Sequence, residues 1–137
     1  MEDRHKNVKC KLCSKLIYST SRSGLCVDCY NNQRKLAKIE RWKQTGDTNC
    51  KVSSTIRGCI REYILQKQEY KCNICGITNK WNGKVLNFVL DHIDGDASNN
   101  VEANLRLVCP NCDSQLDTFK SKNKNSARKH RRIASNN

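Results

Sequence analysis

The chain has 137 residues, of which 36% are apolar and 6% aromatic. This length matches about one ordinary domain and excludes a large multidomain enzyme. Ordinary globular chains are about 45–50% apolar, so hydrophobic burial alone is not expected to hold this chain together, and metal sites or disulfides are expected to add stability. Lys and Arg outnumber Asp and Glu by 26 to 13, and the net charge of +13 favours a polyanionic partner.

The charge is unevenly distributed. Its net value is +6 over residues 1–49, zero over residues 50–119 and +7 over residues 120–137. A neutral centre between basic flanks suits a chemical unit whose flanking segments bind a polyanion, although a merely solubilising surface is the alternative.

The polar N-terminus lacks the apolar region of a signal peptide, and no run reaches the roughly 18 apolar residues of a membrane span. We therefore expect no membrane partner and a reducing, cytoplasmic location.

Eight of the ten cysteines form C-x-x-C pairs, and the spacing within and between pairs suits zinc. Two such pairs supply the four thiolates of a tetrahedral Zn²⁺ site, which has no open position and is structural rather than catalytic. A redox role is the alternative, but it needs a βαβ setting that the sequence does not predict. Cys50 and Cys59 remain outside the pairs. The pattern predicts two structural zinc sites, the first at Cys10, Cys13, Cys26 and Cys29, and the second at Cys72, Cys75, Cys109 and Cys112.

The N-terminal half predicts a zinc module followed by helices. Residues 8–30 form the module, with a loop or short hairpin over residues 14–23. A basic amphipathic helix is predicted over residues 32–43, because Leu36, Ile39 and Trp42 recur at a spacing of three. Residues 44–53 read as a linker. A second helix is expected to start at a Ser54 cap and to present one apolar face, formed by Ile56, Ile60, Tyr63 and Ile64.

The second half predicts the order strand, loop, strand, helix. After a turn at residues 81–84, residues 85–90 form a β-rich run that ends in Asp91-His92, and residues 95–100 form a polar loop. Residues 105–108 read as a second strand that pairs with the first as a hairpin. Pro110 then suits the first position of a helix, whose inner face is expected to carry Cys112, Leu116 and Phe119.

Three stretches of this half resemble the HNH endonucleases of the ββα-metal fold, particularly small free-standing members from phage genomes. They are LDHIDGD at residues 90–96, NLRL at residues 104–107 and CPNCDSQ at residues 109–115. The resemblance covers about residues 55–125. In layout, a four-cysteine module before an HNH unit also resembles some HNH-type restriction enzymes. The expected fold class is a small zinc-stapled α+β chain, in which a ββα-metal unit framed by a four-cysteine site follows the N-terminal module and basic helix.

The resemblance implies roles for four residues. Asp91 resembles the first metal ligand, His92 the base that activates water, and Asn104 the asparagine that braces the loop between the strands. The residue after the last cysteine is usually His or Asn in the family, whereas here it is Asp113, which can still bind a metal ion. Imidazole titrates near working pH, and two carboxylates suit one catalytic Mg²⁺ or Mn²⁺. Asp94, Asp96, Asn99 and Asn100 are expected to be loop residues.

These expectations define four segments and one function. The segments are a zinc module (1–31), a basic helix and linker (32–53), the HNH nuclease domain (54–122) and a basic tail (123–137). The expected function is a metal-dependent DNA endonuclease, of a phage or homing-like type, that holds DNA through residues 32–43 and 120–132. The alternatives are a restriction-like HNH enzyme acting as a homodimer and a non-catalytic zinc protein that only binds nucleic acid.

Overall fold

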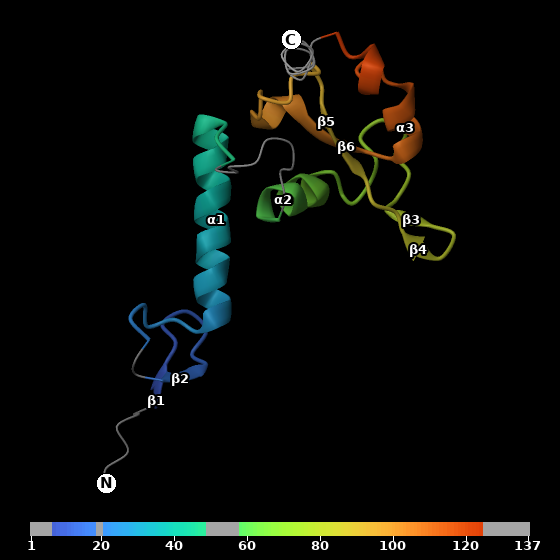
Figure 1. Cartoon of the computed structure of the whole chain (residues 1–137). Helices are drawn as coiled ribbons and strands as arrows, with labels where there is room; N and C mark the ends of the chain where they lie inside the picture. The colour runs from blue at the N-terminus through green and yellow to red at the C-terminus, as the bar shows by residue number, and fades with distance from the viewer. Residues whose placement is uncertain (1–6, 19–20, 49–57, 125–137) are drawn as a thin grey trace, which may run out of the picture. The chain divides into compact units, whose positions relative to one another are not determined.

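The computed structural model describes residues 7–18, 21–48 and 58–124, and Figure 1 shows their course. The chain divides into two compact units, Met1–Lys38 and Ile39–Asn137. Each unit combines helix and strand with one cluster of four cysteines. The prediction of a small α+β chain with two such clusters is therefore confirmed. Within the described residues, no helix is both long and apolar enough to cross a membrane.

The first unit has almost no apolar core. Strand β1 (Asn7–Lys9) pairs antiparallel with β2 (Leu16–Tyr18), so that the expected loop region is in part a short hairpin. Among the described residues of this unit, only Cys10 and Cys26 are buried. The thiol cluster therefore occupies the position that apolar side chains fill in a larger domain. A metal ion bound by these thiols is the natural source of stability for the first unit.

Helix α1 (Val27–Thr45) is longer than the predicted helix over residues 32–43. It begins earlier, directly after Cys26, so that Cys29 lies in its first turn, where Asp28 interacts favourably with the helix dipole. It ends at Gly46, whose φ is +68° and whose N–H donates to the carbonyl oxygen of Trp42 at 2.7 Å. This is the ordinary glycine termination of a helix.

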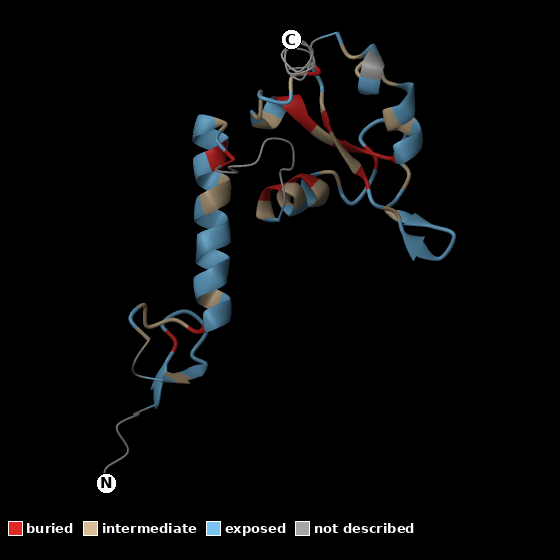
Figure 2. Ribbon diagram, viewed as in Figure 1, coloured by how far each residue is buried: buried red, intermediate tan, exposed pale blue. Residues whose placement is uncertain are grey.

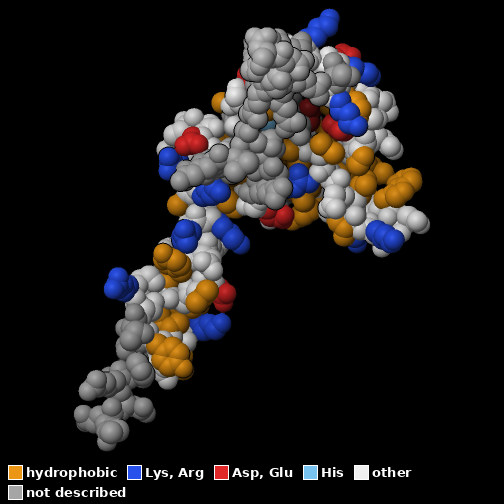
Figure 3. All heavy atoms as spheres, in the orientation of Figure 1, with side chains coloured by type: hydrophobic (Ala, Val, Ile, Leu, Met, Phe, Trp, Pro, Cys, Tyr) orange, Lys and Arg blue, Asp and Glu red, His pale blue; other side chains and the backbone are white. Residues whose placement is uncertain are grey.

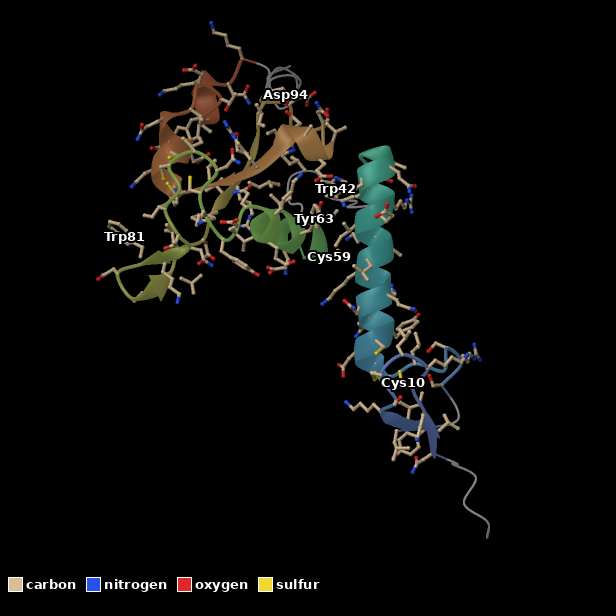
Figure 4. The ribbon with its side chains drawn as sticks, turned by 180° about the vertical axis from the view of Figure 1, so that it is seen from behind. Cys10, Trp42, Cys59, Tyr63, Trp81 and Asp94 are labelled. Atoms are coloured by element: carbon tan, nitrogen blue, oxygen red, sulfur yellow. The ribbon has the colours of Figure 1, made fainter. Side chains whose placement is uncertain are left out.

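The apolar positions predicted for α1 do not form one buried stripe. Leu36 is exposed, Ile39 is half-buried against the core of the second unit, and Trp42 is fully buried in that core. Helix α1 includes the predicted helical residues 32–43, but of the three apolar positions only Ile39 and Trp42 pack against the core. Trp42 meets Tyr63 edge-on, with ring centroids 5.9 Å apart (Figure 4).

The second unit has one small core, drawn in red in Figure 2. Helix α2 (Cys59–Lys67) buries Ile60 and Ile64 and packs against strand β6. Cys59 packs at the margin of the same core, whereas Cys50 and the expected helix start at Ser54 and Ile56 lie outside the described residues. The largest fully buried side chains are those of Trp42, Ile60, Leu107 and Val108.

The expected strand over residues 85–90 is divided between two hairpins. Strands β3 (Lys80–Trp81) and β4 (Lys84–Val85) pair around Asn82-Gly83, where both residues have positive φ, so that the predicted turn is confirmed. After Val85 the chain leaves the pairing of β3 and β4, because the side chain of Phe88 is buried in the core. The guanidinium of Arg61 donates to the carbonyl oxygen of Phe88 and satisfies the backbone at this break.

The second hairpin is followed by a short helix. Strand β5 (Val89–His92) pairs antiparallel with β6 (Leu105–Val108), as predicted, and a 3₁₀ turn (Glu102–Asn104) leads into β6. Helix α3 (Pro110–Gln115) packs against β5. It ends before Leu116 and Phe119, contrary to the expected longer helix, because the chain is extended at Leu116.

Candidate metal sites and active-site residues

Each cysteine cluster has the dimensions of a zinc tetrahedron. The four sulfurs of each cluster lie within 4.8 Å of one another. The sulfurs of Cys13 and Cys26 are 3.6 Å apart, and those of Cys75 and Cys109 are 3.7 Å apart. Zn–S bonds of about 2.3 Å place tetrahedral sulfurs about 3.8 Å apart. The two predicted four-cysteine clusters are therefore confirmed, and each can hold one zinc ion.

The same backbone contact stabilises a thiolate in both clusters. The N–H of Cys26 donates to the sulfur of Cys10, and the N–H of Cys109 donates to that of Cys72, each at 3.2 Å. The contact from Cys26 is the main reason that the pKa of Cys10 falls to about 6. Burial raises the pKa of Cys72, but the N–H groups of Cys75 and Cys109 outweigh it and bring that pKa to about 6. Each cluster therefore contains one cysteine whose lowered pKa favours the thiolate form, which is the form that binds a cation.

The last cysteine of each cluster shows the opposite effect. Contacts with the sulfurs of Cys26 and Cys13 raise the pKa of Cys29 to about 12. Burial, followed by contact with Cys75, raises the pKa of Cys112 to about 12. Four crowded thiols resist full ionisation unless a cation sits among them. This donor set therefore suits a soft divalent metal ion better than it suits four free thiols.

Asp91 lies on β5 in the middle of the hairpin and is only 8% exposed. It stands opposite Arg106 of β6, whose Nε donates to its Oδ2 at 2.7 Å. Burying a carboxylate costs free energy, which an ion pair with an opposite charge offsets. Arg106 therefore stabilises and orients Asp91, a role that the sequence analysis did not assign.

His92 ends β5 and is half-buried. Its Nε2 lies 2.9 Å from Oδ1 of Asn100. An amide oxygen can only accept a hydrogen bond, so this contact places the hydrogen of the neutral ring on Nε2 and the lone pair on Nδ1. The backbone oxygen of Asn100 in turn accepts a hydrogen bond from the indole of Trp42 at 2.7 Å. Asn100, expected to be an ordinary loop residue, thus connects the core to His92.

Asn104 is buried and bound to the loop that follows β5. Its Nδ2 donates to Oδ1 of Asp94 and to the carbonyl oxygen of Asn99, both at 2.8 Å, and its Oδ1 accepts from the N–H of Asp94 at 3.0 Å. Burial raises the pKa of Asp94, but hydrogen bonds from Asn99, Asp96 and Asn104 outweigh it, and the pKa is lowered. Asn104 thus fixes the loop that carries Asn100 and is not placed to contact a substrate through a free amide.

Asp113 lies in the first turn of α3, half-buried. Its pKa is raised, first by burial and then by the negative charge of Asp91, while Lys120 acts in the opposite direction. Two carboxylates that repel each other across β5 and α3 are a donor pair suited to a hard divalent cation. Among the described residues, however, only the two cysteine clusters bring three or more potential ligand atoms within 4.8 Å of one another, so Asp91, His92 and Asp113 do not form so tight a group.

The segments expected to grip DNA are only partly described. Arg34 and Lys35 are exposed on α1, and Figure 3 shows Lys and Arg side chains along this helix. Of the expected basic tail over residues 120–132, the structure describes residues 120–124, and Asn123 donates to the carbonyl oxygen of Gly95 at 2.8 Å. The remaining basic residues of the tail lie outside the described part of the chain.

Comparison with known proteins points to one class of enzyme over part of the chain. Part of the chain is homologous to an endonuclease of the HNH class. That relative is H-N-H endonuclease F-TflIV of Escherichia phage T5, which is 41% identical over 66 residues. The match covers 47% of this chain and 29% of the phage protein, so the chain spans less than a third of that relative. No protein-family model and no solved structure matches.

Proposed function

We propose that the chain is a metal-dependent DNA endonuclease of the HNH type, with β5, β6 and α3 as its ββα-metal unit. One observation carries the proposal: β5 ends in Asp91 and His92, and α3, whose first turn holds Asp113, packs against β5. The name of the phage T5 relative supports the same class of reaction. We also propose the free-standing, phage or homing-like type, on the resemblance of residues 90–96, 104–107 and 109–115 to small phage HNH endonucleases.

His92 is the proposed general base. Phosphodiester hydrolysis needs a water molecule that loses a proton as it attacks phosphorus, and an imidazole with a free Nδ1 can accept that proton. The Asn100 amide holds Nε2–H and so presents Nδ1 as the basic atom. The same contact persists when the ring becomes positively charged, because both nitrogens then carry hydrogen. Asn104 contributes indirectly, through the loop that positions Asn100.

Asp91 and Asp113 are the proposed ligands of one Mg²⁺ or Mn²⁺. Such an ion, when bound, neutralises charge on the phosphate and on the leaving 3′ oxygen. Arg106 occupies Oδ2 of Asp91, so the other oxygen of that carboxylate is the one available for a cation. A bound cation would also relieve the repulsion between Asp91 and Asp113. The two zinc ions in the cysteine clusters are proposed to be purely structural.

The rest of the chain is proposed to hold the DNA. We assign a zinc module to residues 1–31, a basic helix and linker to residues 32–53, the nuclease domain to residues 54–122 and a basic tail to residues 123–137. The basic helix and the tail surround a segment of zero net charge, which suits phosphate contacts on both sides of the cleaved bond.

The test is cleavage of supercoiled plasmid DNA by the zinc-loaded chain with and without Mg²⁺. Wild type is expected to produce relaxed or linear DNA only with Mg²⁺, and His92→Ala is expected to lose nearly all cleavage while keeping its zinc and its circular dichroism spectrum. Cys59→Ser is a control, because Cys59 lies outside both clusters. Cleavage by His92→Ala at the wild-type rate would refute the assignment of the base. Binding of many DNAs without cleavage of any would favour a binding-only zinc protein.

A further inference from the structure

The β3–β4 hairpin exposes two apolar side chains that the core does not bury. All residues from Lys80 to Val85 are exposed, with Trp81 at 63% and Val85 at 69%. Trp42, the other tryptophan, is fully buried. Figure 4 shows the indole of Trp81 pointing away from the ribbon, and Figure 2 shows the whole hairpin as exposed. An exposed tryptophan adds nothing to a core but offers a large apolar ring with one N–H donor for binding.

Each apolar residue of the hairpin is paired with a lysine. Trp81 stands opposite Lys84, and Lys80 stands opposite Val85. Residues directly opposite each other in an antiparallel pair project on the same face, so one face presents an indole beside an ammonium group. Within the described residues, neither lysine takes part in an ion pair. Residues 70–90 contain three lysines and no Asp or Glu.

This composition fits nucleic acid better than protein. Lysine is depleted at the centre of protein–protein interfaces, whereas lysine beside an aromatic ring is the usual combination for contacting phosphates, sugars and bases. Figure 3 shows apolar and basic side chains standing together over this part of the molecule. The chain's net charge of +13 points to the same partner.

The hairpin is also held in place by the backbone. Asn82 and Gly83 both occupy the left-handed region that the tight turn requires. At its base, the N–H of Leu86 donates to the carbonyl oxygen of Asn79 at 2.8 Å, and the N–H of Asn79 donates to that of Tyr70 at 3.0 Å. The base of the hairpin is thus hydrogen-bonded to the segment 70–79, which includes the first pair of the second cysteine cluster. A backbone that is already ordered loses little conformational entropy on binding.

We propose that the β3–β4 hairpin contacts the DNA backbone beside the cleavage site, with Trp81 against a sugar and Lys84 on a phosphate. This inference rests on the proposed endonuclease function. Val85 precedes Asp91 by only six residues. An extended chain covers about 3.3 Å per residue, so the hairpin lies within about 20 Å of Asp91, or about six base pairs of duplex.

The first experiment uses intrinsic fluorescence of the full, zinc-loaded chain with a 30-base-pair DNA duplex, without added Mg²⁺. Trp81→Phe leaves the buried Trp42 as the remaining tryptophan, so with excitation selective for tryptophan the difference between wild type and this variant reports on Trp81. We expect the duplex to quench wild type strongly and Trp81→Phe weakly. Equal quenching of both proteins would overturn the proposed contact.

The second experiment measures duplex affinity over a range of salt concentrations. Trp81→Ala is expected to weaken binding at least fivefold, and Lys84→Ala to reduce the slope of log affinity against log salt by about 0.9. Lys67→Ala is the matched control, since its ammonium group already pairs with Glu102 at 2.6 Å. Wild-type affinity and slope in both hairpin variants would overturn the inference.

The two proposals fail in different ways. If the hairpin variants bind normally while plasmid cleavage still requires His92, the hairpin contact is wrong and the endonuclease proposal stands. If Trp81 is quenched and its loss weakens binding, but no DNA is cleaved, the contact is supported and the endonuclease proposal fails. If wild type binds no duplex at any salt concentration, both are refuted.

Discussion

The indole N–H of Trp42 donates a hydrogen bond to the backbone oxygen of Asn100 at 2.7 Å and joins residues 58 positions apart. Asn100 in turn holds His92 through its side chain. The end of α1 is therefore part of the structure that positions the proposed base. Helix α1, which is predicted to contact DNA, therefore also carries Trp42, about four turns from its start. Through Asn100, Trp42 helps to position the proposed base His92.

Replacement of Asn100 should lower cleavage through its effect on His92. Asn100→Ala removes the acceptor that fixes the His92 tautomer, and cleavage should fall roughly ten- to hundredfold. Asn100→Asp keeps an oxygen that accepts from Nε2–H and should retain more activity than Asn100→Ala. Plasmid cleavage rates at saturating Mg²⁺ measure both variants, and circular dichroism checks that both fold. Equal losses in the two variants, or a wild-type rate in Asn100→Ala, would remove Asn100 from the positioning role.

Trp42→Phe should lower both stability and cleavage. It leaves a space in a fully buried position and an unpaired Asn100 carbonyl group, which together should cost about 2 kcal/mol of unfolding free energy. Urea unfolding followed by circular dichroism measures this loss. Trp81→Phe is the matched control and should change stability by less than about 0.5 kcal/mol. Equal losses in the two variants would contradict the difference in burial.

Asp113→Asn should raise the Mg²⁺ concentration needed for half-maximal cleavage and lower the maximal rate. The amide keeps the size of the side chain but removes the charge that a hard cation prefers. A Mg²⁺ titration of plasmid cleavage provides the measurement. Asp117→Asn is the matched control, because Asp117 is exposed nearby on the same segment. An unchanged Mg²⁺ requirement in Asp113→Asn would exclude Asp113 as a ligand.

Loss of one cysteine should affect only the unit that contains it. Cys109→Ser should reduce bound zinc from two ions to one and unfold the hairpin that carries Asp91 and His92. Cys10→Ser should also lose one zinc ion but should keep the cooperative unfolding transition of the second unit. Metal analysis combined with thermal unfolding distinguishes these results. A fully folded Cys109→Ser protein would show that the second cluster is not required for the stability of the second unit.

The Lys67–Glu102 ion pair predicts a pH-dependent contribution to stability. The hydrogen bond from Lys67 lowers the pKa of Glu102, and Tyr63 adds to the effect. A carboxyl with a lowered pKa in the folded state stabilises above its unfolded pKa and loses this effect as pH falls through its folded pKa. Glu102→Gln should therefore cost less than about 1 kcal/mol at pH 7. Wild type and Glu102→Gln should converge in unfolding curves below about pH 4, whereas a constant difference would exclude the ion pair as the cause.

Local patterns predicted much of the second unit. The C-x-x-C spacing predicted both cysteine clusters, because the ligand geometry depends on short sequence separations. Asn82-Gly83 predicted its turn, since this dipeptide readily adopts positive φ at both positions. The run over residues 85–90 could not be divided in advance, because the break depends on Phe88 entering a core built by distant segments.

Local sequence patterns could not predict the side-chain contacts around the proposed site. Arg106 meets Asp91 only through the register of β5 and β6, which the length of the intervening loop does not fix. Asn100 reaches His92 because Asn104 and Asp94 shape that loop. Trp42 showed a helical spacing in sequence, but nothing local indicated the loop that its indole would meet.

The two cysteine clusters close loops of different length and therefore have different chain-entropy costs on binding zinc. The pairs of the first cluster are separated by 12 residues and those of the second by 33. On chain entropy alone, closing the longer loop costs about 0.9 kcal/mol more, which is about fivefold in zinc affinity. The second cluster is in turn favoured by the core that contains Cys72 and Cys109. Where loop entropy outweighs this packing, scarce zinc fills the N-terminal module first, and the segment proposed to carry the active site is completed last.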